Sequence, residues 1–238
     1  IHALELTLAD SLEPVSAALI TRVRNVFDTR ADAATIDAHL IRQPVLAEVV
    51  KSHGGMRLPG AFDGFELLLR AILGQVISVK GATTLSGRMA TAYGEAIATP
   101  WPELTHLTPS AERLARARLP RIARIGLPKK RAECIQAVAR AANNGDLSLE
   151  PGGDPDRVCQ QLISLPGIGE WTAAYVAMRA LAWPDALPLG VLGIKKALNL
   201  SRAADIEAAT EAWRTYRAYG ASYLWISLGG GYSSAPHI

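Results

Sequence analysis

The chain has 238 residues, a formal net charge of +3 and 49% hydrophobic residues, enough to bury one large core or two smaller ones. No apolar run reaches the ~20 residues that a membrane-spanning helix needs, and no basic-then-apolar signal segment opens the chain. The only cysteines, Cys134 and Cys159, are too few for a disulfide framework, a zinc site or a four-cysteine iron–sulfur cluster. The composition therefore favours a protein that works away from membranes and keeps its thiols reduced.

A weak alternation of apolar and polar residues opens the chain. Leucines at positions 4, 6 and 8 alternate with other residue types, which predicts a strand over residues 2–8. A lone strand does not make a sheet. Either further strands exist upstream in the full protein, or this segment packs on the helices.

Helical periodicity dominates from residue 12 onward. The predicted helices cover residues 12–27, 31–40, 46–51, 61–93 with a break at 74–78, 110–118, 129–143, 157–181 with a turn at 166–169, 195–200, 206–219 and 221–228. Residues 229–238 are expected to form a flexible tail. The pattern predicts a mainly α fold.

Positive charge is concentrated in one of these segments. Between Glu112 and Arg140 there are nine basic residues, and only Glu112 and Glu133 oppose them. A local basic face suits a polyanion such as DNA. The alternative, an ordinary solvated helix surface, fits the charge pattern equally well.

The turn at residues 166–169 has an unusual composition, Pro-Gly-Ile-Gly. Pro166 resists continuing the preceding helix, and Gly167 and Gly169 allow the chain to reverse within a few residues. The next helix then begins with amides that have no intrahelical partner, which is a ready site for an anion. The alternative is an ordinary corner between two helices that happens to use glycine.

Residues 165–173 read LPGIGEWTA, and this string resembles the signature of the helix-hairpin-helix DNA glycosylases, particularly the DNA-3-methyladenine glycosylase II branch. The resemblance extends over about residues 4–228. It implies a two-lobed helical glycosylase fold with a truncated α/β N-terminal domain. The implied parts are a remnant of that domain at 1–50, a helical lobe at 51–64 and 184–228, a helical lobe at 65–183, and a tail at 229–238.

The run AILGQVISV at residues 71–79 also resembles the family. The resemblance implies that this turn meets DNA through Gln75, Val76 and Ser78, with Val76 as the wedge that enters the base stack. Valine is small for a wedge, and plain core packing is the alternative. Further implied DNA contacts are Gly167, Gly169, Thr172, Lys129, Lys130 and Arg131. The backbone carbonyls of Leu165 and Ile168 are implied ligands of a monovalent cation, and no other cofactor is expected.

Excising a damaged base requires the nucleotide to leave the duplex and the base to be held in a pocket. Trp171 and Tyr175 are four residues apart and share one helix face. Aromatic rings attract a cationic alkylated base by roughly 0.5–2 kcal/mol. The resemblance implies that both, together with Trp225, line the lesion pocket, and core packing is the alternative for each tryptophan. Bifunctional relatives carry a Schiff-base lysine at the position of Trp171, so a monofunctional enzyme is indicated.

The catalytic carboxylate is where the chain departs from the family pattern. The family places an aspartate after a proline and two variable residues, whereas residues 188–195 read PLGVLGIK here, with Val191 at the catalytic position. Valine cannot stabilise positive charge on the sugar, and losing one such group costs on the order of 10²–10³ in rate. Asp185, six residues earlier, is expected to be a structural loop residue.

The expected function is that of a base-excision repair glycosylase that hydrolyses the N-glycosidic bond of alkylated purines, with turnover impaired at Val191. One alternative is a module that binds damaged DNA without cutting it. The other is a helical interaction domain in which the hairpin is only a corner. The expected partner is double-stranded DNA containing alkylated bases, the expected state a monomer, and the expected location the bacterial cytoplasm at the nucleoid.

Overall fold

A computed structural model describes residues 3–189 and 192–228 of the chain. The helices are η1 (Asp10–Val15), α1 (Ser16–Val26), α2 (Ala33–Leu40), α3 (Pro44–His53), α4 (Gly64–Gly74), α5 (Val79–Tyr93), α6 (Ala111–Ala115), α7 (Leu119–Ala123), α8 (Lys129–Asn143), α9 (Pro155–Ile163), α10 (Glu170–Arg179), α11 (Leu192–Leu198), α12 (Ala203–Ala209), η2 (Glu211–Trp213) and α13 (Arg217–Ser227). Across these described ranges the only β pairing is an isolated antiparallel bridge between Ala96 and His106. The predicted mainly α fold is confirmed.

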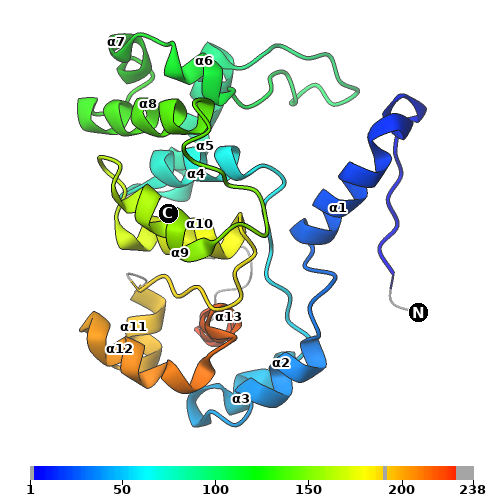
Figure 1. Ribbon diagram of the computed structural model, residues 1–238, viewed down its shortest axis with the longest axis vertical. Helices are drawn as coiled ribbons and strands as arrows, with labels where there is room; N and C mark the ends of the chain where they lie inside the picture. Colours follow the sequence, from blue (N-terminus) through cyan, green and yellow to red (C-terminus); the bar gives the residue numbers. More distant parts are fainter. Residues whose placement is uncertain (1–2, 190–191, 229–238) are drawn as a thin grey trace.

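The helices are arranged in two groups (Figure 1). The helices α4 to α10 form the upper group, and α2, α3, α11, α12 and α13 form the lower one. The chain passes from the lower group to the upper one before α4 and returns after α10, while α1 lies beside the upper group and the chain after it leads down to α2. In the described part of the chain, no helix is long and apolar enough to cross a bilayer.

Helix α4 is the central helix of the upper group. An Asp63 oxygen accepts a hydrogen bond from the Glu66 amide at 2.8 Å and caps the helix, as a short acidic side chain does at this position. Its apolar face, which includes Leu68 and Ile72, is completely buried, and α4 packs against α5, α8 and α10. This packing fixes the turn that follows α4, where the site begins.

Helix α13 has the same central role in the lower group, where it packs against α3 and α11. Trp213 is buried beside it, and a Cβ on Gly220 would lie only 2.6 Å from the Trp213 ring. Tyr219 donates a hydrogen bond from its hydroxyl to Asp28 at 2.6 Å, which ties α13 to the end of α1. The lower group is thus held by aromatic packing around a glycine.

The prediction of a strand over residues 2–8 was wrong for residues 3–8, the part of it that the structure describes. Residues 3–8 have no regular secondary structure, and most of their side chains are exposed. In the described ranges no neighbouring strand offers hydrogen bonds to this segment, and an unpaired strand is not stable.

One helix prediction in another part of the chain was wrong, and the start of another helix was misplaced. The helix predicted over residues 206–219 ends at Ala209, because the Thr210 hydroxyl donates to the Ile206 carbonyl at 2.8 Å and satisfies the helix end. Helix α13 then begins at Arg217 instead of residue 221. The short helix α7 was not predicted, because its five residues are too few to show a period and include Pro120.

Candidate functional site

The turn between α9 and α10 is a tight reversal built on two glycines. Gly167 has φ +84°, a conformation that residues with side chains rarely adopt. A Cβ there would lie 3.0 Å from the Cβ of Cys134, whose burial raises the pKa of its thiol to about 11. Gly169 is the N-cap of α10 and faces open space. The turn therefore presents the first amides of α10, which have no intrahelical partner, beside an unobstructed glycine.

A second turn, between α4 and α5, is joined to this one by hydrogen bonds. The side-chain amide of Gln75 donates to the Gly167 carbonyl at 3.2 Å and to the Thr172 hydroxyl at 3.4 Å. Arg131 at the start of α8 donates to the Gln75 carbonyl at 2.6 Å. The structure thus brings together three segments that were predicted separately from the sequence to meet DNA.

Val76 stands at the tip of this second turn. Its side chain is 98% exposed, so the alternative that it packs in the core was wrong. Its φ of +60° is an outlier for a β-branched residue, and the left-handed conformation costs roughly 1–2 kcal/mol. Ser78 follows it and caps α5 by accepting from the Gly81 amide at 3.2 Å. A strained backbone that exposes an apolar side chain points to a functional role.

Trp171 and Tyr175 form a stacked pair on the first turns of α10. Their ring centroids are 5.2 Å apart with an interplanar angle of 14°. Tyr175 is 8% exposed, and Trp171 is half-buried with its ring at the edge of the core. Trp171 is therefore a partly accessible ring supported from behind by a buried one.

Arg179 continues this face of α10 and was missed in the sequence. Its Nη1 donates to the Tyr175 hydroxyl at 3.2 Å, and its guanidinium carbon lies 5.6 Å from the centre of the Tyr175 ring. Its buried Nε has no hydrogen-bond partner among the described residues. The spacing of Trp171, Tyr175 and Arg179, four residues each, was the available signal.

Trp225 lies on α13, in the lower group. It is half-buried against the core, and its buried indole N–H has no hydrogen-bond partner in the described part of the chain. Among those residues, no ring contact joins it to Trp171 or Tyr175. The structure therefore supports the pair Trp171 and Tyr175 as a unit, and the place of Trp225 in a pocket stays a prediction.

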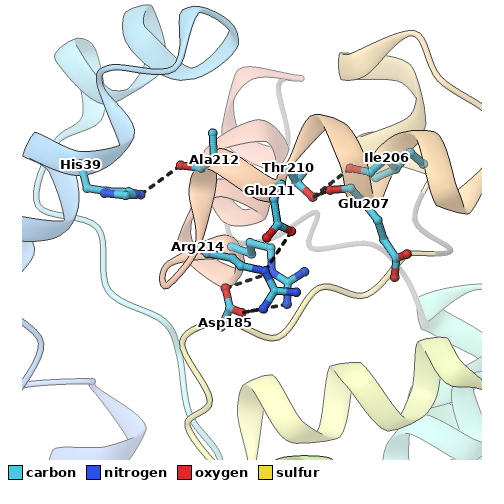
Figure 2. A network of polar contacts seen from close by, with 9 residues as sticks. His39, Asp185, Ile206, Glu207, Thr210, Glu211, Ala212 and Arg214 are labelled. Carbon is cyan, nitrogen blue, oxygen red and sulfur yellow. Dashed lines mark hydrogen bonds and ion pairs between the residues drawn. The ribbon is translucent and has the colours of Figure 1, made fainter.

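The loop after α10 is anchored by a buried ion pair. Asp185 is 6% exposed and accepts from Arg217 through both oxygens, at 2.9 Å from Nε and 2.8 Å from Nη2. Arg214 adds a third bond at 3.2 Å and also pairs with Glu211 (Figure 2). The prediction that Asp185 is a structural residue is confirmed, because its oxygens are occupied by guanidinium groups.

The remaining predicted residues fall into three groups. Val191 lies outside the described residues, between the anchored loop and α11. Lys129 and Lys130 are exposed at the start of α8, where Lys129 lies 3.7 Å from Glu133. Arg131 is half-buried, and its bond to Gln75 makes it a link between α8 and the Val76 turn.

Comparisons with known proteins identify the family of the chain. Residues 1–63 match the family model described as the AlkA N-terminal domain. DNA-3-methyladenine glycosylase 2 of Escherichia coli is 34% identical over 229 residues, which cover 96% of this chain and 78% of that protein. The chain belongs to the DNA-3-methyladenine glycosylase II family.

The family also includes longer proteins. A Mycobacterium tuberculosis protein named as a probable bifunctional transcriptional activator and DNA repair enzyme AlkA is 38% identical over 213 residues. The match covers 87% of this chain, and the chain spans 42% of the length of that relative.

Solved structures show the same fold as this family member. The 3-methyladenine DNA glycosylase of Archaeoglobus fulgidus superimposes with a TM-score of 0.74 at 20% identity, over 92% of this chain and 76% of that one. A Schizosaccharomyces pombe 3-methyladenine DNA glycosylase in complex with abasic DNA gives a TM-score of 0.64 at 18% identity, over 82% and 97%. At these identities the likeness is one of fold.

Proposed function

We propose that the chain is a monofunctional DNA glycosylase that acts as a monomer on alkylated purines in duplex DNA. The observation that carries the proposal is the assembly of the Gly167 hairpin, the exposed Val76 and the stacked Trp171–Tyr175 pair on adjoining ends of α4, α5 and α10. Amides at a helix start bind phosphate. An apolar wedge holds a gap in the base stack, and an aromatic ring receives the extruded base.

The chemistry assigned to the chain's own side chains is base recognition more than bond cleavage. The half-buried Trp171 offers a π-face to a cationic base. Trp171 cannot form a Schiff base, so water is the acceptor of the sugar and the strand stays intact. Asp185, already paired with two arginines, is not free to stabilise charge on the sugar. With Val191 at the catalytic position, release depends on the cationic alkylpurine being a good leaving group and is slow.

The hairpin also fits a monovalent cation, as the family implies. Gly167 turns the backbone with φ +84°, and Gly169 leaves open space beside it. The Leu165 carbonyl accepts the Ile168 amide at 3.3 Å and keeps a second lone pair for a ligand. The carbonyls of Leu165 and Ile168 would hold the ion, which would supply positive charge to a DNA phosphate.

The reaction type is tested by analysing products from DNA carrying 3-methyladenine or 7-methylguanine. We expect free methylated base and abasic DNA with no strand break until alkali is added. Strand cleavage without alkali would contradict the monofunctional assignment. The same assay on Val191→Asp distinguishes a glycosylase from a non-catalytic damaged-DNA-binding module, the alternative that the valine at 191 favours. If the unaltered chain and Val191→Asp both bind lesion DNA and neither releases the base, the binding module is supported.

The wedge is tested with Val76→Gly. Glycine tolerates φ +60°, so the free energy of unfolding should stay equal or rise by up to about 1 kcal/mol. The affinity for lesion duplex should fall at least about tenfold, because nothing then fills the gap in the stack. Urea denaturation and fluorescence anisotropy measure the two effects. Unchanged lesion affinity would show that the exposed valine has no part in binding.

A further inference from the structure

A cavity of about 590 Å³ lies at the end of α5 farthest from Val76, and the proposed function does not use it. Its polar lining comes from the end of α5, from α6 and from α7. We call it the arginine pocket, defined by Tyr93, Glu112, Arg113, Arg116, Arg118 and Arg121.

Positive charge in the arginine pocket is largely unneutralised. Its single carboxylate, Glu112, pairs with Arg116 at 2.8 Å. Arg113, Arg118 and Arg121 are exposed and make no ion pair within the described ranges of the chain. A concave surface with three free guanidinium groups is suited to an anion.

Tyr93 adds a neutral donor to these cations. Its phenol lines the same pocket as Arg113 and Arg121. Burial raises the pKa of this half-buried phenol, and the charges of the two arginines act in the opposite direction. The phenol therefore stays protonated at neutral pH. Guanidinium forks beside a hydroxyl donor match the three oxygens of a phosphate group.

The arginine pocket lies at a defined distance from the proposed lesion site. Helix α5 starts three residues after Val76 and has 15 residues, so at 1.5 Å per residue its two ends are about 21 Å apart. Duplex DNA rises 3.4 Å per base pair, so for a duplex that runs along α5 about 21 Å corresponds to roughly six base pairs.

Basic side chains occupy the interval between the two places. Helix α7 packs on α8, and α8 packs on α4 (Figure 1). Exposed Arg124, Lys129 and Lys130 lie on the segment that joins α7 to the start of α8, where Arg131 reaches the Val76 turn through Gln75. Cationic side chains therefore extend from the arginine pocket to the proposed lesion site, as a bound DNA backbone requires.

We propose that the arginine pocket binds a backbone phosphate of the same duplex, about six base pairs from the extruded nucleotide and on one side of it only. The inference rests on the proposed function, because the hairpin and Val76 set the position of the duplex. It assigns to α6 and α7 the task of aligning the flanking DNA.

The test compares Arg113→Gln/Arg121→Gln with the unaltered chain on lesion duplexes of different lengths. In the short duplex about four base pairs flank the lesion on each side, and two longer ones extend one side or the other to about ten. We expect one extension to raise the affinity of the unaltered chain about tenfold and the other to leave it unchanged. The double variant should lose this gain, and the slope of its log affinity against log salt should be smaller by about one unit, because one phosphate contact is lost.

The matched control is Arg24→Gln/Arg42→Gln, which removes the same charge from exposed positions on and near the other helices. It should keep the gain, and all three proteins should bind the short duplex equally. The proposal is overturned if the pocket variant keeps the gain, or if the control loses it to the same extent. The proposal is also overturned if calorimetry shows that the pocket binds inorganic phosphate while Arg113→Gln/Arg121→Gln keeps the affinity gain on the longer duplex. The ligand of the pocket would then be a free anion. Failure of every form to bind the short lesion duplex instead refutes the proposed function.

Discussion

Replacing Val191 with aspartate should raise the single-turnover rate of alkylated-base release by about 10²-fold or more. The reason is electrostatic: cleavage of the N-glycosidic bond develops positive charge on the sugar, and one preorganised opposing group is worth on the order of 10²–10³ in rate. Everything else that the proposal needs is already present in the chain, from the hairpin to the stacked Trp171 and Tyr175. Base release is measured by chromatography with enzyme in excess over DNA.

Val191→Asn is the matched control, because it has almost the size of aspartate without the charge. It should raise the rate far less, and all three proteins should bind lesion DNA with similar affinity. Equal rates for the unaltered chain and Val191→Asp would mean that residue 191 is not the catalytic position and that another group does the chemistry.

Asp185→Ala should lower the free energy of unfolding by about 3–5 kcal/mol, because a buried charge that loses its partner is strongly destabilising. The substitution removes the carboxylate and leaves Arg217 as such a charge. The measurement is urea denaturation followed by circular dichroism. The loop that Asp185 anchors leads to residue 191, so a loss of excision would accompany the loss of stability.

An exposed ion pair supplies the control for this prediction. Glu112→Ala breaks the bond to Arg116, in which both side chains are more than half exposed, and exposed pairs are worth about 0–1 kcal/mol. Asp185→Ala could instead leave the free energy of unfolding unchanged and abolish excision when it is combined with Val191→Asp. That result would assign the chemistry to Asp185 and refute its structural role.

The local features of the site could be predicted from the sequence because each has a local cause. Gly167 has the positive φ that a tight reversal needs, so a turn at residues 166–169 was predicted from its proline and glycines. The interpretation of this turn as a helix-hairpin-helix depended on the family resemblance of residues 165–173. The break between α4 and α5 at residues 75–78 was predicted in the same way. Its conformation was not, because an apolar Val76 within a helical pattern fits a core position as well as an exposed turn.

Long-range features could not be predicted. The partner of Asp185 is Arg217, 32 residues later in the chain, and no local pattern connects them. Arg179 was missed because the sequence does not show whether a charged side chain points to solvent or contacts an aromatic ring, as Arg179 contacts the Tyr175 ring. The strand expected over residues 2–8 depended on neighbours that the predicted elements did not include, and the described residues 3–8 form none.

The most direct test of the account is the preference of the chain for a lesion. The affinity for a duplex containing one non-hydrolysable methylated-purine analogue is compared with that for the same duplex without it, for the unaltered chain and Trp171→Ala. Base stacking on an aromatic side chain is worth about 1–3 kcal/mol, so we expect about a tenfold preference that Trp171→Ala removes while its affinity for undamaged DNA is kept. Equal affinity of the unaltered chain for the two duplexes, or no salt-dependent DNA binding at all, would contradict a lesion-binding site at Trp171 and leave the hairpin as a structural corner.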